Sequence, residues 1–126
     1  MKKIIKTDKA PAPVGPYNQA TMSENFIFTA GQIAMDPKTG KLSENDVRIQ
    51  TERVIENLKA VLEEAGSGLS KVLKTTVFLK NMDDFAAMNE VYARYFQENA
   101  PARSAIEVAR LPKDVLVEIE CIALSG

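Results

Sequence analysis

The stretch that decides the fold closes the chain and reads Val115-Leu116-Val117-Glu118-Ile119-Glu120-Cys121-Ile122-Ala123-Leu124. Successive side chains of a β-strand point to opposite faces of its sheet, so residues two apart share a face. One face of this stretch carries Val117, Ile119, Cys121 and Ala123, which suit a position beneath helices. The alternation therefore predicts a strand with one face in the protein core.

The opposite face of this strand is expected to carry Leu116, Glu118, Glu120, Ile122 and Leu124. A sheet face that meets water is normally polar, yet three of these side chains are apolar. The chain offers only two helical patterns, so the second face needs a cover from outside the chain. Exposed apolar patches of this kind mark interfaces, and self-association is the simplest explanation.

Two segments further upstream carry apolar residues at the three- and four-residue spacing of a helix. The first covers residues 47–65 and stops at Gly66, and the second begins near Asp83 or Asp84 and ends before Pro101. Strands are expected at residues 3–6, 26–33, 72–80, 102–109 and 115–124. Within the fourth of these strands, Ile106 and Val108 read as core residues. This order predicts a two-layer α+β fold in which both helices pack on one face of one sheet, with residues 1–126 forming a single domain.

Composition excludes several kinds of chemistry. The chain has no His and one Cys, so it has no His base and no ordinary set of zinc ligands. Its 16 basic and 17 acidic residues give a net charge of −1, without the basic excess of a dedicated nucleic-acid binder. No membrane span or signal peptide is recognisable, and a lone Cys suits a reducing compartment. We therefore expect a cytoplasmic protein with no metal, no membrane partner and no nucleic-acid partner.

Arg103 is the first candidate for a site, because it lies near the start of an expected strand. If the last two strands pair antiparallel, Arg103 shares a sheet face with Glu118 and Glu120. An Arg grips a carboxylate through two parallel hydrogen bonds, and a nearby carboxylate can hold and deprotonate a water molecule. The alternative is a cross-strand salt bridge at an interface, and spacing alone favours this alternative because structural ion pairs are commoner than sites.

Longer motifs point more specifically to a site. Three blocks near the end of the chain are Pro101-Ala102-Arg103-Ser104-Ala105-Ile106, Ala109-Arg110-Leu111-Pro112-Lys113-Asp114 and Val117-Glu118-Ile119-Glu120. Upstream blocks are Gly15-Pro16-Tyr17-Asn18-Gln19-Ala20, Gly31-Gln32-Ile33, and Lys74-Thr75-Thr76-Val77-Phe78-Leu79 ahead of Asp84-Phe85 and Asn89. In this order, from about Ala10 to Leu124, they resemble the motifs of the RidA (YjgF) family of imine deaminases.

The resemblance implies a fold like that of chorismate mutase and a homotrimer with a central β-barrel. Family members hydrolyse 2-imino acids such as 2-iminobutanoate and 2-iminopropanoate, and their enamine tautomers, to 2-oxo acids and ammonia. This activity protects pyridoxal-phosphate enzymes from reactive by-products and needs no cofactor. The ligand partners are then small 2-imino and 2-oxo acids, bound in clefts between neighbouring subunits.

By the same resemblance, Arg103 binds the substrate carboxylate and Glu118 positions and activates the attacking water. Tyr17 and Asn89 match pocket residues, Tyr17 being supplied by the neighbouring chain, and backbone groups near Gly31 and Ala105 complete the pocket. Many members carry Cys at the position of Ala105, and several carry Ser at that of Ala30. The presence of Arg103 favours retained activity.

Two other functions stay open on the sequence. One is a regulatory protein that senses a small carboxylate through Arg103 and acts through a partner protein. The other is a ribonuclease or translation inhibitor, an activity that has also been attached to this family. The absence of His and of a basic face makes this third hypothesis the weakest.

Overall fold

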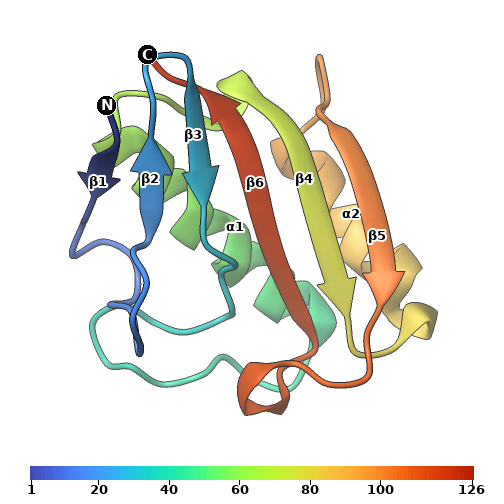
Figure 1. Cartoon of the computed structure of the whole chain (residues 1–126). Helices are drawn as coiled ribbons and strands as arrows, with labels where there is room; N and C mark the ends of the chain where they lie inside the picture. The colour runs from blue at the N-terminus through green and yellow to red at the C-terminus, as the bar shows by residue number, and fades with distance from the viewer.

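A computed structural model describes all residues, 1–126, as one six-stranded sheet with both long helices on one face (Figure 1). The strands are β1 Lys3–Ile5, β2 Ala20–Met22, β3 Phe26–Thr29, β4 Val72–Leu79, β5 Ala102–Glu107 and β6 Val117–Leu124. The helices are α1 Val47–Glu64 and α2 Phe85–Tyr95, with short 3₁₀ turns at Leu69–Lys71, Met82–Asp84 and Pro112–Asp114. The predicted two-layer α+β architecture is confirmed. Strand β2 is missing from the sequence prediction, because three residues are too few to show a period.

The sheet is mixed, with the order β1-β2-β3-β6-β4-β5. Strand β6 pairs antiparallel with β3 and β4, whereas β5 pairs parallel with β4 at the edge. The last two strands do not pair with each other, because β4 lies between them, so the condition on which Arg103 would share a face with Glu118 and Glu120 is not met. The physical reason is helix α2: it carries the chain back along the sheet from β4, so that the next strand enters in the same direction.

The core lies between the sheet and the helices. The apolar stripe of α1 is buried there, and Asp46 begins that helix by accepting hydrogen bonds from the backbone N–H groups of Arg48 and Ile49. The inner face of β6 is buried as predicted and consists of Val117, Ile119, Cys121 and Ala123. Leu116 precedes β6 and packs in part against this core.

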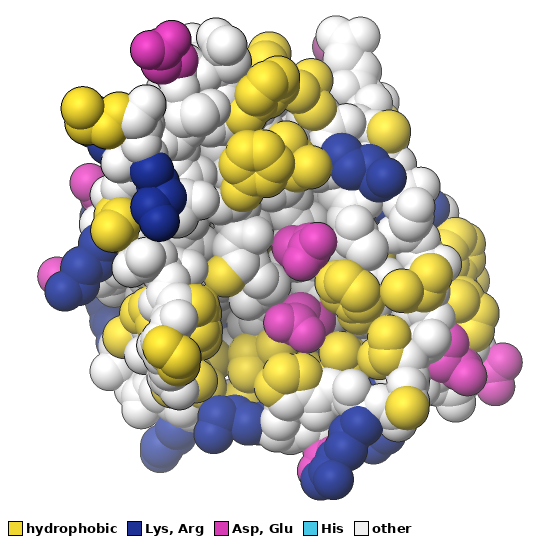
Figure 2. All heavy atoms as spheres, in the orientation of Figure 1, with side chains coloured by type: hydrophobic (Ala, Val, Ile, Leu, Met, Phe, Trp, Pro, Cys, Tyr) yellow, Lys and Arg dark blue, Asp and Glu magenta, His cyan; other side chains and the backbone are white.

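The face of the sheet away from the helices is open in the single chain. Phe26, Phe28, Ile106 and Leu124 are exposed on it or at its border. Figure 2 shows apolar side chains over this face with acidic side chains among them. The sequence-predicted apolar outer face is thus present. Neither helix has the length and apolar character needed to cross a membrane.

Candidate functional site

A cavity of about 410 Å³ lies where the N-terminal arm meets the loop after β3 and the start of β6. It brings together three residues that sequence reasoning had placed in the site, Tyr17, Gly31 and Glu118. We call this cavity the Glu118 cleft. Its complete lining is Pro11, Ala12, Val14, Tyr17, Gln19, Ala30, Gly31, Gln32, Ile33, Met35, Pro112, Lys113 and Glu118. Glu118 and Lys113 are its only ionisable groups besides the Tyr17 phenol, in walls that are otherwise mostly apolar.

The proline-rich arm that carries Tyr17 is held by the buried side chain of Gln19. Its Nε2 group donates to the carbonyl oxygens of Thr7, Ala10 and Pro11 at 3.0, 3.2 and 2.9 Å. Its Oε1 atom accepts from the Thr7 N–H at 2.8 Å. Prolines interrupt a sheet ladder because they have no N–H donor, and the backbone carbonyls of this segment accept hydrogen bonds from the buried Gln19 amide instead. Gln19 therefore fixes one wall of the Glu118 cleft.

The opposite wall is a loop that follows β3 and is held from helix α1. Asn57 is fully buried and donates from Nδ2 to the carbonyl oxygens of Ile33 and Met35 at 3.1 and 3.0 Å. The backbone of Gln32 exchanges hydrogen bonds with that of Ile119 on β6. This pairing places Gly31 directly against the side chain of Glu118, the neighbour of Ile119.

The Glu118 carboxyl group is unusual in its electrostatic surroundings. Partial burial raises its pKa, and repulsion from the nearby Glu120 carboxylate raises it further. The three ion pairs of the chain are Arg48–Glu90, Arg94–Glu90 and Arg110–Asp114, and none of them involves Glu118. A half-buried carboxylate with a raised pKa and no cationic partner is suited to accept a proton.

Arg103 lies elsewhere, beside helix α2. Its Nη1 group donates to Asn89 Oδ1 at 2.6 Å. Its Cζ atom lies 4.7 Å from the ring centroid of Tyr92 and 5.3 Å from that of Phe85. Ala105, two residues along β5, packs against the core from the same side. Asn89 is thus placed as a partner of Arg103.

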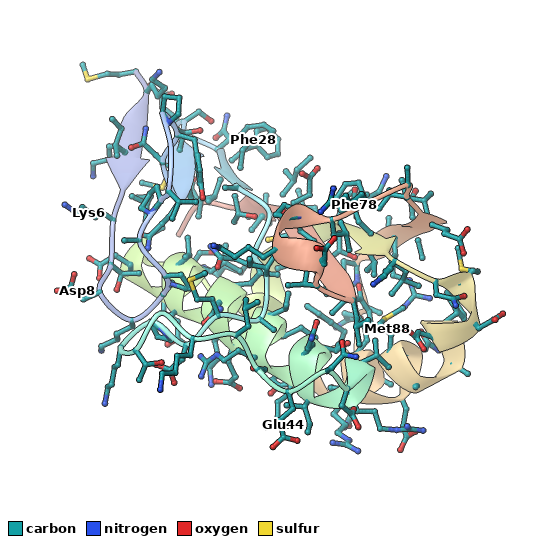
Figure 3. All side chains as sticks on the ribbon, turned by 90° about the horizontal axis from the view of Figure 1, so that it is seen from below. Lys6, Asp8, Phe28, Glu44, Phe78 and Met88 are labelled. Atoms are coloured by element: carbon teal, nitrogen blue, oxygen red, sulfur yellow. The ribbon has the colours of Figure 1, made fainter.

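Arg103 and Glu118 lie on opposite faces of the sheet. Arg103 is in register with Thr75 and, across β4, with Cys121, and both of these residues are buried beneath the helices. Glu118 is in register with Phe78, which Figure 3 shows on the side of the sheet away from the helices. The chain therefore brings Tyr17, Gly31 and Glu118 together, and separately Arg103 and Asn89.

The predicted meeting of Arg103 with Glu118 and Glu120 on one face of a single chain is therefore wrong. The prediction took Ile106 as a core residue, but Ile106 is 43% exposed, which inverts the two faces of β5. Strand β5 is an edge strand with apolar residues on both faces, so its pattern does not show which face is buried.

Other candidate chemistry is sparse. No group of three or more His, Cys, Asp or Glu side chains is arranged to hold a metal ion. Burial raises the pKa of the Cys121 thiol to about 11, so this side chain stays protonated at neutral pH. Cys121 is therefore an inert core residue, in agreement with its predicted position on the inner face of β6.

Comparisons with known proteins agree with one another. The family model described as Endoribonuclease L-PSP matches residues 7–125. A RutC family protein of Pyrococcus abyssi is 61% identical over 122 residues, which cover 97% of this chain and 96% of that protein. The solved structure of RidA from an Antarctic Psychrobacter species is 46% identical, with a TM-score of 0.94 and coverage of 97% and 98%. The structure of E. coli TdcF with bound serine is 44% identical, with a TM-score of 0.94 and coverage of 98% and 99%.

The chain belongs to the RidA/YjgF family. Its fold, a mixed sheet with two helices on one face, agrees with these neighbours and with the predicted chorismate-mutase-like arrangement. Membership supports a function of the Rid type for this chain.

Sequence reasoning missed the positioning role of Gln19 and Asn57. A signal for Asn57 was available, because it is a polar residue within the apolar stripe of α1, one position before the buried Leu58. A buried amide is stable only when its hydrogen bonds are satisfied, so such a residue predicts a backbone partner nearby. The sequence does not say which loop supplies that partner.

Gly31→Ala is expected to lower the rate of any reaction that depends on Glu118 by about 10²-fold, while the protein stays folded. A Cβ atom at position 31 would lie 2.8 Å from Glu118 Cδ, so the carboxylate must move aside. The end of a Glu side chain moves easily, and the thermal unfolding midpoint should change little. The control is Gly68→Ala, where an added Cβ meets nothing within 4 Å. Equal activity of the two variants would show that the position of Glu118 is unimportant.

Proposed function

We propose that this protein is a hydrolytic deaminase of small 2-imino acids and their enamines, such as 2-iminobutanoate and 2-iminopropanoate. The products are the 2-oxo acid and ammonia, and the activity protects pyridoxal-phosphate enzymes in the cytoplasm. The observation that carries this proposal is a pair of chemically complementary side chains, Arg103 and Glu118. One is an arginine with free donors, and the other is an unpaired carboxylate of raised pKa in an apolar cleft.

The active site lies between two copies of the chain in this proposal. Arg103, with Asn89 and Ala105 beside it, comes from one subunit, and Tyr17, Gly31 and Glu118 come from the next. The assembly is a homotrimer in which the open sheet faces line a central β-barrel. Two functional groups on opposite faces of one sheet require a second copy if they are to act on one small ligand.

The chemistry needs few groups. Arg103 binds the substrate carboxylate through parallel hydrogen bonds, which holds the imine carbon in place. Glu118 accepts a proton from a water molecule as the water oxygen attacks that carbon. The proton passes to the nitrogen as the C=N electron pair moves there, which gives a carbinolamine. Glu118 then takes the hydroxyl proton of the carbinolamine and passes it to the same nitrogen, so the C–N bond breaks and ammonia leaves as the C=O bond of the 2-oxo acid forms. Tyr17 and the backbone near Gly31 line the space for the substrate side chain.

The relative solved with bound serine supports a ligand with this chemistry. Serine carries a carboxylate and a nitrogen on the adjacent carbon, as a 2-imino acid does. The apolar lining of the Glu118 cleft suits a short side chain and also limits competing water around the reacting carbon.

The test of this function is the release of ammonia and 2-oxobutanoate from freshly generated 2-iminobutanoate. The spontaneous rate without protein is subtracted, because the imine also hydrolyses unaided. A rate that rises in proportion to added protein supports the proposal. A rate equal to the background would favour the regulatory alternative, in which Arg103 holds a small carboxylate as a signal for a partner protein.

The description of the matching family model raises ribonuclease as a second candidate. The chain has no His and a net charge of −1, and neither favours RNA cleavage or nucleic-acid binding. RNA cleavage that survives rigorous purification and disappears in Glu118→Gln would support this candidate instead.

Leu124→Asp is expected to convert the homotrimer to smaller species. Leu124 is 43% exposed in the single chain, on the face proposed to line the barrel, so a buried charge there opposes assembly. The mass in solution is measured by light scattering after size exclusion. The control is Ile49→Asp, since Ile49 is 42% exposed on helix α1. An unchanged mass for Leu124→Asp would place the subunit contacts elsewhere.

A further inference from the structure

The guanidinium group of Arg103 lies along one face of helix α2. The residues beneath it are Phe85, Asn89 and Tyr92, at the i, i+4 and i+7 spacing that places side chains on one face of a helix. Phe85 and Tyr92 belong to the apolar stripe of α2, which alone suggests only packing. Their rings nevertheless lie within the distance at which a cation is attracted to an aromatic face.

Tyr92 is itself held firmly. Its hydroxyl group lies 2.7 Å from Thr75 Oγ1 at the buried centre of β4. The ring of Phe96, the residue that follows helix α2, packs against it, with centroids 4.7 Å apart and the planes inclined by 39°. A ring fixed by a hydrogen bond and by a second ring presents a stationary surface to the Arg103 guanidinium.

These contacts leave part of the guanidinium free. An arginine side chain has five N–H donors in one plane, and Asn89 accepts from only one of its groups, Nη1. The aromatic rings attract the cation without using any donor. The remaining donors lie in the guanidinium plane, where a carboxylate can accept two parallel hydrogen bonds.

We propose that Phe85 and Tyr92 are positioning residues that orient the Arg103 guanidinium before a 2-imino acid or 2-oxo acid binds. This inference rests on the proposed function for the identity of the ligand. A free arginine loses much rotamer freedom when it binds an anion, and an oriented arginine has already lost it. The two rings thereby increase affinity for the ligand carboxylate without touching it.

The first experiment concerns the free protein and needs no ligand. The order parameter of the Arg103 Nε–H group is measured by ¹⁵N NMR relaxation in wild type, Phe85→Leu and Tyr95→Leu. Phe85→Leu keeps an apolar side chain but removes the ring, so Arg103 is expected to become more mobile on the picosecond–nanosecond timescale. Tyr95→Leu is the matched control, because Tyr95 is a partly buried aromatic residue of the same helix whose hydroxyl group donates to Glu56 on helix α1 and whose ring does not lie beneath Arg103. Equal order parameters in wild type and Phe85→Leu would overturn the inference.

The second experiment measures binding of 2-oxobutanoate by calorimetry. Phe85→Leu is expected to weaken binding by about 3- to 10-fold, the range given by the loss of one cation–π contact. Phe85→Tyr should restore it, and Tyr95→Leu should bind as wild type does. Unchanged binding in Phe85→Leu would contradict the inference. If Arg103→Ala binds as tightly as wild type, the proposed function itself fails. The NMR experiment still tests the orientation of Arg103 in that case, because it needs no ligand.

Discussion

Replacing Arg103 with Ala is expected to lower kcat/KM for 2-iminobutanoate by about 10²- to 10⁴-fold. This range corresponds to the loss of two charge-assisted hydrogen bonds of about 1.5–3 kcal/mol each. Arg103→Lys should recover little of this loss, because an ammonium group cannot form both parallel bonds. The readout is background-subtracted ammonia release, with solution mass as the control for assembly. Undiminished turnover in Arg103→Ala would remove the proposed role of this residue.

The position of Arg103 on the opposite face from Glu118 permits a sharper version of this test. Arg103→Ala and Glu118→Ala subunits are inactive alone, but a mixed trimer has one junction where both intact residues meet. Random assembly of equal amounts then restores about one quarter of the wild-type sites in a cyclic trimer. The two variants are unfolded, mixed and refolded together, and trimers of each variant combined after folding are the control. No recovery would show that the site is not shared between subunits.

Replacing Glu118 with Gln is expected to reduce kcat by about 10²- to 10⁴-fold, the usual contribution of a general base. The amide keeps the shape of the side chain but cannot accept the proton of the attacking water. Binding of 2-oxobutanoate should change much less, because Arg103 holds the carboxylate. Equal losses of turnover and binding would mean that Glu118 contributes to binding only.

Glu118→Gln is expected to lose activity without losing stability against unfolding at neutral pH. The pKa of Glu118 is raised in the folded protein, so the folded state holds this proton more tightly than the unfolded chain. The resulting stabilisation is present at low pH and is lost as the pH rises through the folded-state pKa. At neutral pH the half-buried carboxylate is therefore a cost, and Gln removes it. The unfolding midpoint at neutral pH should not fall.

The raised pKa also fixes the sign of the pH dependence of the same site. Glu118 acts as a base only when ionised, so activity should decline with acid at a pH above the usual Glu range. Glu120→Gln removes one cause of the shift and should move this acid limb to lower pH, which a kcat/KM profile measures. An acid limb that stays in place would show that Glu120 does not influence the base.

Much of the fold follows from local pattern. Alternation along 115–124 placed Val117 and Ile119 in the core, and the stripe over 47–65 placed helix α1. These features depend on neighbours within a few residues, so a single sequence determines them. The family motifs also pointed to Tyr17, Gly31 and Glu118, which the structure gathers in one cleft.

The structure alone decided how distant segments meet. Period-two alternation separates two faces of a strand but does not say which face is buried or which strand is its neighbour. For edge strand β5 the pattern misled, because Ile106 is apolar and exposed whereas Arg103 turns toward helix α2. Likewise, the side chains of Gln19 and Asn57 donate hydrogen bonds to backbone carbonyls of other segments, and only the folded structure shows which carbonyls these are. The sequence by itself therefore determined both helices, every strand except β2, and the family to which the chain belongs. The placement of Arg103 and Glu118 on opposite faces came from the order of strands, which packing between remote parts of the chain selects.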